Sequence, residues 1–156
     1  MKYICPLITV KDIDRARDFY ENILNQKVKF DFGENVTFWG DFAIHLESHF
    51  SHLIDEKPIK QGGNNFELYF EEDQIEQMVA TLKEHHIQFI HEIREQPWQQ
   101  KVVRFYDPDQ HIIEIGESLE HLAYRLHNKG LTPEHISKRT SMPLDFVNES
   151  IKQFKE

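Results

Sequence analysis

The chain has 156 residues, a single cysteine and a formal net charge of −9. A chain of this length forms one domain, or one domain with an appendage, and it can fold without disulfides or a structural metal. The acidic balance argues against nucleic acid or an anionic membrane surface as a partner. One cysteine excludes an internal disulfide, and residues 1–12 lack the pattern of a signal peptide. We therefore expect a cytoplasmic protein without a membrane segment.

The first half of the chain predicts a strand, a helix and three further strands. Residues 4–10 alternate and are rich in branched side chains, which is typical of a strand. Asp12 then opens an amphipathic helix, and residues 50–65 are predicted as a connector. The apolar stripe of the helix is formed by Ile13, Ala16, Phe19, Tyr20, Ile23 and Leu24. The three strands between helix and connector cover residues 28–33, 35–40 and 42–48.

The second half of the chain repeats this order. Residues 66–72 predict a strand, and a second amphipathic helix follows it. The buried side of this helix is formed by Ile75, Met78, Val79 and Leu82. Three more strands cover residues 87–93, 101–106 and 111–117. Because Ile13 aligns with Ile75 and Ala16 aligns with Met78, the pattern indicates two βαβββ units and an α+β fold.

Residues 118–156 differ from the repeat and predict a helical extension. A short amphipathic helix with Leu122 and Leu126 inward ends near Gly130. Thr132 and Pro133 provide an N-cap and a first helical position for the next helix. A last helix starts at Pro143 and places Leu144, Val147 and Ile151 on one face. We expect this extension to pack on the main body, over the pocket or at a dimer edge.

The extension is also similar to a short helix-turn-helix, with its turn at residues 140–143. In a DNA-binding version the second helix enters the major groove and presents basic or amide side chains. Here that helix carries Asp145 and Glu149, and its lysines, Lys152 and Lys155, stand at the far end. Together with the acidic balance of the chain, this pattern argues against DNA binding.

Two motifs resemble those of a known superfamily. VKDIDRARDFYENIL (residues 10–24) resembles the opening of the vicinal-oxygen-chelate superfamily, which includes glyoxalase I, bleomycin- and fosfomycin-resistance proteins and extradiol dioxygenases. RFYDPDQHIIEIGE (residues 104–117) resembles its closing signature, although Gln110 replaces the usual turn glycine and would strain a left-handed turn. The resemblance implies a domain over residues 1–117, built from modules at about 1–49 and 64–117. Together they form a curved mixed sheet around a pocket, often in a homodimer.

The resemblance also implies a metal site. Metal-dependent members take one ligand from the first strand and one from the last strand of each module. The corresponding positions here are Cys5, His45, Glu67 and Glu114. One divalent ion would be zinc if Cys5 is a ligand, and otherwise nickel, manganese or iron. The two-histidine, one-carboxylate set of extradiol dioxygenases is not reproduced.

Two classes of function are open at this point. In a metal-dependent lyase or isomerase acting on a small oxygenated compound, Glu67 or Glu114 would move a proton. In a non-catalytic protein that sequesters an aromatic or drug-like molecule, Glu67 and Glu114 would pair with His45 and Arg104 without a metal, and Cys5 would be a small buried hydrophobe. The small-molecule pocket in either case has the candidates Phe38, Trp39, Tyr69, Trp98, Arg104 and Phe105.

Overall fold

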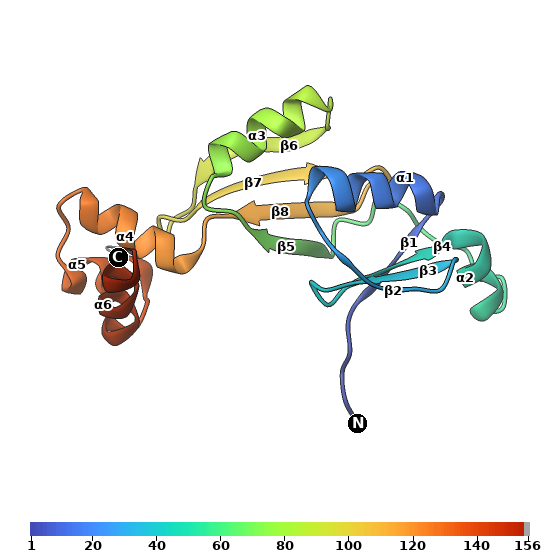
Figure 1. The fold of residues 1–156 in the computed structure, drawn as a ribbon, viewed down its shortest axis with the longest axis horizontal. Coiled ribbons are helices and arrows are strands. Elements are labelled where there is room, and N and C mark those ends of the chain that lie inside the picture. Colours follow the sequence, from blue (N-terminus) through green and yellow to red (C-terminus); the bar gives the residue numbers. More distant parts are fainter. Residues whose placement is uncertain (155–156) are drawn as a thin grey trace. The chain divides into compact units, whose positions relative to one another are not determined.

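The computed structural model describes residues 1–154 and contains two four-stranded sheets together with helices (Figure 1). Its contacts divide the chain into two compact units. The first unit holds residues 1–67 and 106–112, and the second holds residues 68–105 and the chain from residue 113 onward. The predicted α+β fold is confirmed. No helix among residues 1–154 is both long enough and apolar enough to cross a membrane.

The first sheet contains the predicted strand, helix and three strands. The strands lie in the order β1-β4-β3-β2, with β1 parallel to β4 and the other pairs antiparallel. They are β1 (Leu7–Val10), β2 (Val28–Asp31), β3 (Asn35–Phe38) and β4 (Ala43–Leu46). The predicted helix is α1 (Ile13–Arg17), which continues as a π-helical segment, η1 (Asp18–Ile23).

The helix over the first sheet begins where the sequence predicts it. Asp12 is the N-cap, and its carboxylate accepts a hydrogen bond of 3.0 Å from the backbone N–H of Arg15. The apolar stripe turns inward and supplies the buried side chains Ala16, Phe19, Tyr20, Ile23 and Leu24. Tyr20 packs against Phe38 and Phe42, with ring centroids 5.7 and 5.1 Å away. These aromatic contacts form the core of the first unit.

The chain after β4 corrects one sequence-based expectation. Residues 47 and 48 were predicted as strand and residues 50–65 as a connector, but Glu47–Leu53 forms a helix, α2. β4 ends at Leu46 because its partner β1 ends at Val10, the residue paired with Leu46. The next backbone groups have no partner strand, so they form their hydrogen bonds within a helix. The positive end of the helix dipole stabilises the negative charge of Glu47 in the first turn.

The second sheet has the same topology as the first. Its strands lie in the order β5-β8-β7-β6, which corresponds position by position to β1-β4-β3-β2. They are β5 (Glu67–Glu71), β6 (Phe89–Glu95), β7 (Lys101–Tyr106) and β8 (Ile112–Gly116). The helix α3 (Ile75–Glu84) runs along this sheet (Figure 1) and buries Ile75, Val79 and Leu82. The predicted repeat is therefore confirmed.

The extension forms three helices whose ends follow the predicted signals. They are α4 (Leu119–Asn128), α5 (Pro133–Thr140) and α6 (Leu144–Gln153). Ser118 and Thr132 cap α4 and α5 by accepting backbone N–H groups with their hydroxyl oxygens. Gly130 adopts a positive φ of 92° after α4, a conformation that favours glycine.

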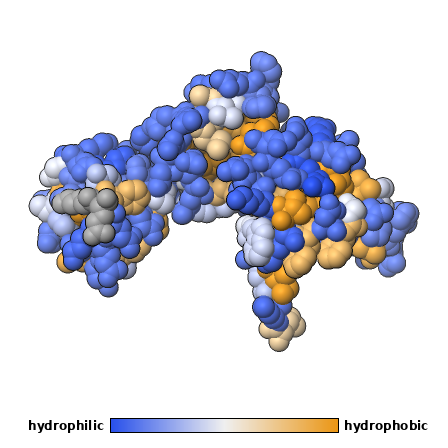
Figure 2. All heavy atoms as spheres, in the orientation of Figure 1, coloured by the Kyte–Doolittle hydropathy of each residue, from blue (hydrophilic) through white to orange (hydrophobic). Residues whose placement is uncertain are grey.

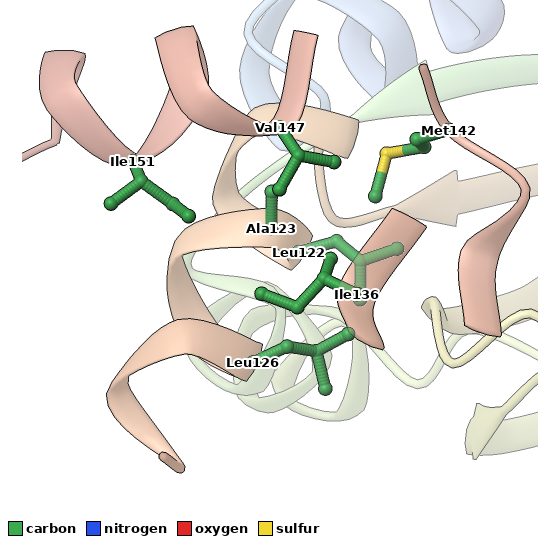
Figure 3. Packing of buried hydrophobic residues seen from close by; sticks show 7 residues of the cluster. All are labelled: Leu122, Ala123, Leu126, Ile136, Met142, Val147 and Ile151. Carbon is green, nitrogen blue, oxygen red and sulfur yellow. The ribbon is translucent and has the colours of Figure 1, made fainter. Parts of the chain in front are cut away.

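The three helices pack around a hydrophobic core of their own (Figure 3). The side chains in this core are Leu122, Ala123, Leu126, Ile136, Met142, Val147 and Ile151. All of them come from the extension, so its helices stabilise one another. Polar contacts connect it to the second sheet: Arg125 of α4 donates to the backbone carbonyl of Gln99 and to the carboxylate of Glu117.

The acidic turn before β8 contains the left-handed residue that the sequence indicates. Gln110 has a φ of 70°, and its N–H donates to the carbonyl of Asp107. One carboxylate oxygen of Asp107 accepts the backbone N–H groups of Asp109 and His111, and the other accepts the Tyr20 hydroxyl at 2.8 Å. The side-chain bonds of Asp107 therefore hold Gln110 in a conformation that favours glycine.

Replacing Gln110 by glycine is expected to stabilise the protein. A left-handed conformation costs a residue with a Cβ about 1 kcal/mol, of which the greater freedom of unfolded glycine cancels a part. Gln110→Gly should therefore raise the free energy of unfolding by about 0.5 kcal/mol, measured by urea denaturation. Gln110→Ala keeps the Cβ and serves as the control. A glycine variant no more stable than the alanine variant would contradict this explanation.

Candidate functional site

His45, the candidate ligand from the first module, is buried in β4 with both ring nitrogens occupied. Asn35 on the neighbouring strand donates its side-chain N–H to Nδ1 at 3.0 Å. Nε2 then carries the proton and donates to Nδ1 of His49 in α2 at 2.8 Å. Burial, and secondarily the charge of His49, lower the pKa of His45. His45 is therefore a neutral imidazole at pH 7 that forms part of a polar network between β3, β4 and α2.

The other two candidates in the first unit are more exposed. Cys5 is partly buried in the segment that precedes β1, and Thr9 is the residue of β1 that lies opposite His45. Glu67 is exposed at the start of β5, where it lines an open hollow of about 350 Å³ together with residues 64–66 and Ile112. The strand register therefore does not place Cys5 opposite His45.

Glu114, the candidate from the last strand, is 6% exposed and forms an ion pair with Arg104 of β7. Its neighbours Ile113 and Ile115 are buried, and strand geometry turns them to the opposite face of the sheet. Arg104 also approaches the ring of His91 on β6, with Nη1 3.5 Å from Nε2. A carboxylate buried at this position is stabilised only if a cation accompanies it, and the guanidinium provides that charge.

Neither unit by itself assembles these donors into a site for the divalent ion that the resemblance implies. Within residues 1–154, no three histidine, cysteine, aspartate or glutamate side chains come together in a group able to hold a metal ion. His45 uses both ring nitrogens in hydrogen bonds, and the carboxylate of Glu114 is paired with a fixed guanidinium. A metal at Glu114 would have to compete with Arg104 for the carboxylate.

The predicted pocket aromatics fall into two groups. Phe38 and Phe105 are fully buried and belong to the cores: Phe38 stacks on Phe42 at 4.7 Å, and Phe105 meets Phe89 edge-on at 6.2 Å. Three candidates present ring surface to solvent, and they are Trp39, Tyr69 and Trp98. Trp39 lies in the first unit beneath the ammonium group of Lys29, which is 4.9 Å from its ring centroid.

Tyr69 and Trp98 meet at a residue that the sequence did not single out, Gln100. The indole N–H of Trp98 donates to Gln100 Oε1 at 2.9 Å, and Gln100 Nε2 donates to the Tyr69 hydroxyl at 2.9 Å. Gln100 is 5% exposed although it ends the loop before β7, a context in which glutamine is usually solvated. Burial raises the pKa of Tyr69 to about 12, so its hydroxyl stays protonated at neutral pH.

Comparison with known proteins places the chain in a family. Its sequence matches the glyoxalase-like domain over residues 3–120, so the chain belongs to this family and to the glyoxalase/bleomycin-resistance superfamily that the motifs resemble. The family match ends at residue 120, so most of the helical extension lies beyond it. No curated protein matches the chain.

Solved structures agree with this assignment. A protein of unknown function from Agrobacterium tumefaciens is 38% identical, with a TM-score of 0.70 over 76% of this chain and 95% of its own. A lactoylglutathione lyase from the same species is 18% identical, with a TM-score of 0.58 over 76% of this chain and 95% of its own. The fosfomycin resistance protein FosX of Mesorhizobium loti is 18% identical, with a TM-score of 0.56 over 80% of this chain and 97% of its own. The last two share the fold with this chain.

Burial of His45 predicts a dependence of stability on pH. Because the folded state lowers the pKa of His45, the unfolded chain binds more protons once the pH falls below the ordinary histidine value of about 6.5. The free energy of unfolding should therefore decrease between about pH 7 and pH 5. The free energy of unfolding is measured by urea denaturation at pH 7 and at pH 5. Its decrease should be smaller in His45→Asn than in the wild-type protein, and unchanged in His135→Asn, a variant at an exposed histidine. An unchanged pH dependence in His45→Asn would contradict the prediction.

Proposed function

We propose that the protein binds a small oxygenated organic molecule, aromatic or drug-like, at the Arg104–Glu114 pair of the second sheet, without a divalent metal ion. The observation that carries this proposal is the ion pair itself. It stands at the strand position where the superfamily resemblance implies a metal ligand, and it supplies a positive charge next to the carboxylate.

The chemistry of the pair suits an oxygenated ligand. A guanidinium presents five N–H donors in a plane, a geometry that suits carboxylate, carbonyl and hydroxyl oxygens. The Arg104 side chain is about a quarter exposed, at 26%, whereas that of Glu114 is 8% exposed. Arg104 is therefore the member that reaches solvent, and Glu114 holds it in place.

The alternative is a metal-dependent lyase or isomerase, and its requirements differ. It needs several free donors at one point, whereas His45 and Glu114 are both engaged with protein partners. In the proposed binding function these partners are retained when the ligand arrives. Glu114 then positions Arg104 and takes no part in coordinating a metal.

The first experiment is a screen of oxygenated aromatic fragments by ligand-observed NMR, in the presence of EDTA. We expect fragments that bind to the wild-type protein, and we expect Arg104→Met to weaken them about tenfold, the value of one charge-assisted hydrogen bond. Arg94→Met, a change at an exposed arginine of β6, is the matched control. Fragments that bind only after zinc, nickel or manganese is added would contradict the proposal.

Metal analysis of protein purified without a histidine tag tests the same proposal independently. We expect substoichiometric metal in the wild-type protein and in His45→Ala and Glu114→Ala. A full equivalent of metal that disappears in both variants would support the metal-dependent class instead.

We also infer that the protein acts in the cytoplasm as a homodimer. Figure 2 shows hydrophobic surface in orange over the strands of the first unit. The exposed apolar side chains of this unit include Phe30, Phe32 and Trp39. Exposed apolar clusters of this kind support association. Light scattering should give about twice the 18.7 kDa chain mass, and Phe32→Glu should shift the protein towards monomer. Leu53→Glu, at an exposed leucine of α2, is the control, and a monomeric wild-type protein would overturn the inference.

A further inference from the structure

The half-exposed rings of Tyr69 and Trp98 are both hydrogen-bonded to one buried side-chain amide, that of Gln100. Trp98 is 43% exposed in the loop between β6 and β7, and Tyr69 is 46% exposed on β5. The amide of Gln100 accepts from the indole and donates to the phenol, with both distances 2.9 Å. It also donates to the backbone carbonyl of Glu117 at 2.7 Å. Gln100 therefore uses its oxygen and both of its N–H groups.

Tyr69 can reach Gln100 because β8 ends in glycine. β8 lies between β5 and β7 in the sheet, and Tyr69 reaches past Gly116 to Gln100. A Cβ on Gly116 would lie 3.0 Å from the Gln100 nitrogen and 3.1 Å from the Tyr69 hydroxyl, closer than real Cβ atoms normally approach. Glycine at this position therefore leaves room for the close approach of two side chains, which a Cβ would displace by a few tenths of an ångström.

The polar atoms of both rings are already used within the protein. The Tyr69 hydroxyl accepts from Gln100 and donates to Glu71 at 3.0 Å, and the only N–H of the Trp98 ring donates to Gln100. What the rings present to solvent is their apolar surface. Rings held in this way lose little conformational freedom on binding, which favours affinity for a flat partner.

We propose that Tyr69 and Trp98 form a stacking subsite for a flat aromatic ring, and that Gln100 is the positioning residue of this subsite. The proposal rests on the proposed small-molecule function and names the class of ligand group that this part of the site takes. Arg104 binds the oxygen of the ligand, whereas the subsite selects planar aromatic rings over saturated rings of equal size.

The hydrogen bonds that hold Gln100 in place continue into the helical extension. The carbonyl that accepts from Gln100 belongs to Glu117, whose carboxylate is bound by Nε and Nη2 of Arg125 in α4. Arg125 also donates to the backbone carbonyl of Gln99, the left-handed residue next to Gln100. The extension thus supports the loop that carries Trp98 and the strand end that receives Gln100.

A matched pair of probes tests the subsite: 2-naphthol and its saturated counterpart decahydro-2-naphthol, which share a hydroxyl and differ in planarity. Their binding is followed through the indole N–H signal of Trp98 in two-dimensional NMR, assigned with Trp39→Phe. We expect 2-naphthol to shift this signal to saturation and to bind about three- to tenfold more tightly than the saturated probe, the value of one aromatic stacking contact.

Gln100→Met leaves the Glu117 carbonyl unpaired and should lower the thermal midpoint, but in the folded variant it should weaken the flat probe selectively and so remove the preference. A purely structural role would lower stability and weaken both probes equally. Gln77→Met, at an exposed glutamine of α3, is the control. If Gln100→Met does not fold, Trp98→Leu removes one ring at a half-exposed position. Its binding of the two probes is followed on the probe signals by ligand-observed NMR, and it should give the same loss of preference.

The subsite proposal would be overturned by equal binding of the two probes or by a Trp98 signal that does not move. A preference for the flat probe that persists in the folded variants would also overturn it. Fragment binding that depends on Arg104 is measured separately in the EDTA screen. If the subsite test fails but fragment binding still depends on Arg104, the proposed function stands and only the subsite is wrong. If fragment binding does not depend on Arg104, both proposals are wrong.

Discussion

The second unit depends on one buried carboxylate, that of Glu117. The residue has no exposed surface, and its two oxygens accept from Arg125 at 2.8 and 2.5 Å and from the backbone N–H of Lys101 at 2.8 Å. A carboxylate without such partners is too costly to bury, and removing one partner of a buried pair typically costs about 3–5 kcal/mol. Because Glu117 follows β8 and precedes α4, this cluster joins the sheet, the β6–β7 loop and the extension.

The candidate site follows from the same strand. β8 turns Ile113 and Ile115 towards the core of the second sheet, so Glu114 and Gly116 lie on the opposite face. The charge of Glu114 is balanced by Arg104, and the missing side chain of Gly116 lets Tyr69 reach Gln100. One short strand therefore supplies a fixed polar group and the opening through which Tyr69 reaches Gln100.

Much of the fold was predictable because its signals are local. Asp12, Ser118 and Thr132 cap helices through bonds to residues three positions away, and the helical stripes recur at a period that sequence reveals. α2 was missed because the end of β4 depends on where its partner β1 stops. Gln100 was missed because its burial depends on Tyr69, 31 residues away along the chain.

The sequence by itself determined the two βαβββ units, the helical extension, the superfamily, and the position of Glu114 as a charge within an apolar strand. Only the tertiary structure decided what that charge faces, because the partner of a buried ion depends on which strand lies beside it. Arg104 is that partner, and it stands on β7, the neighbour of β8 in the sheet. Strand order and register are long-range properties, so composition and period indicate which side chains are inward but leave their partners to the packing of the sheet.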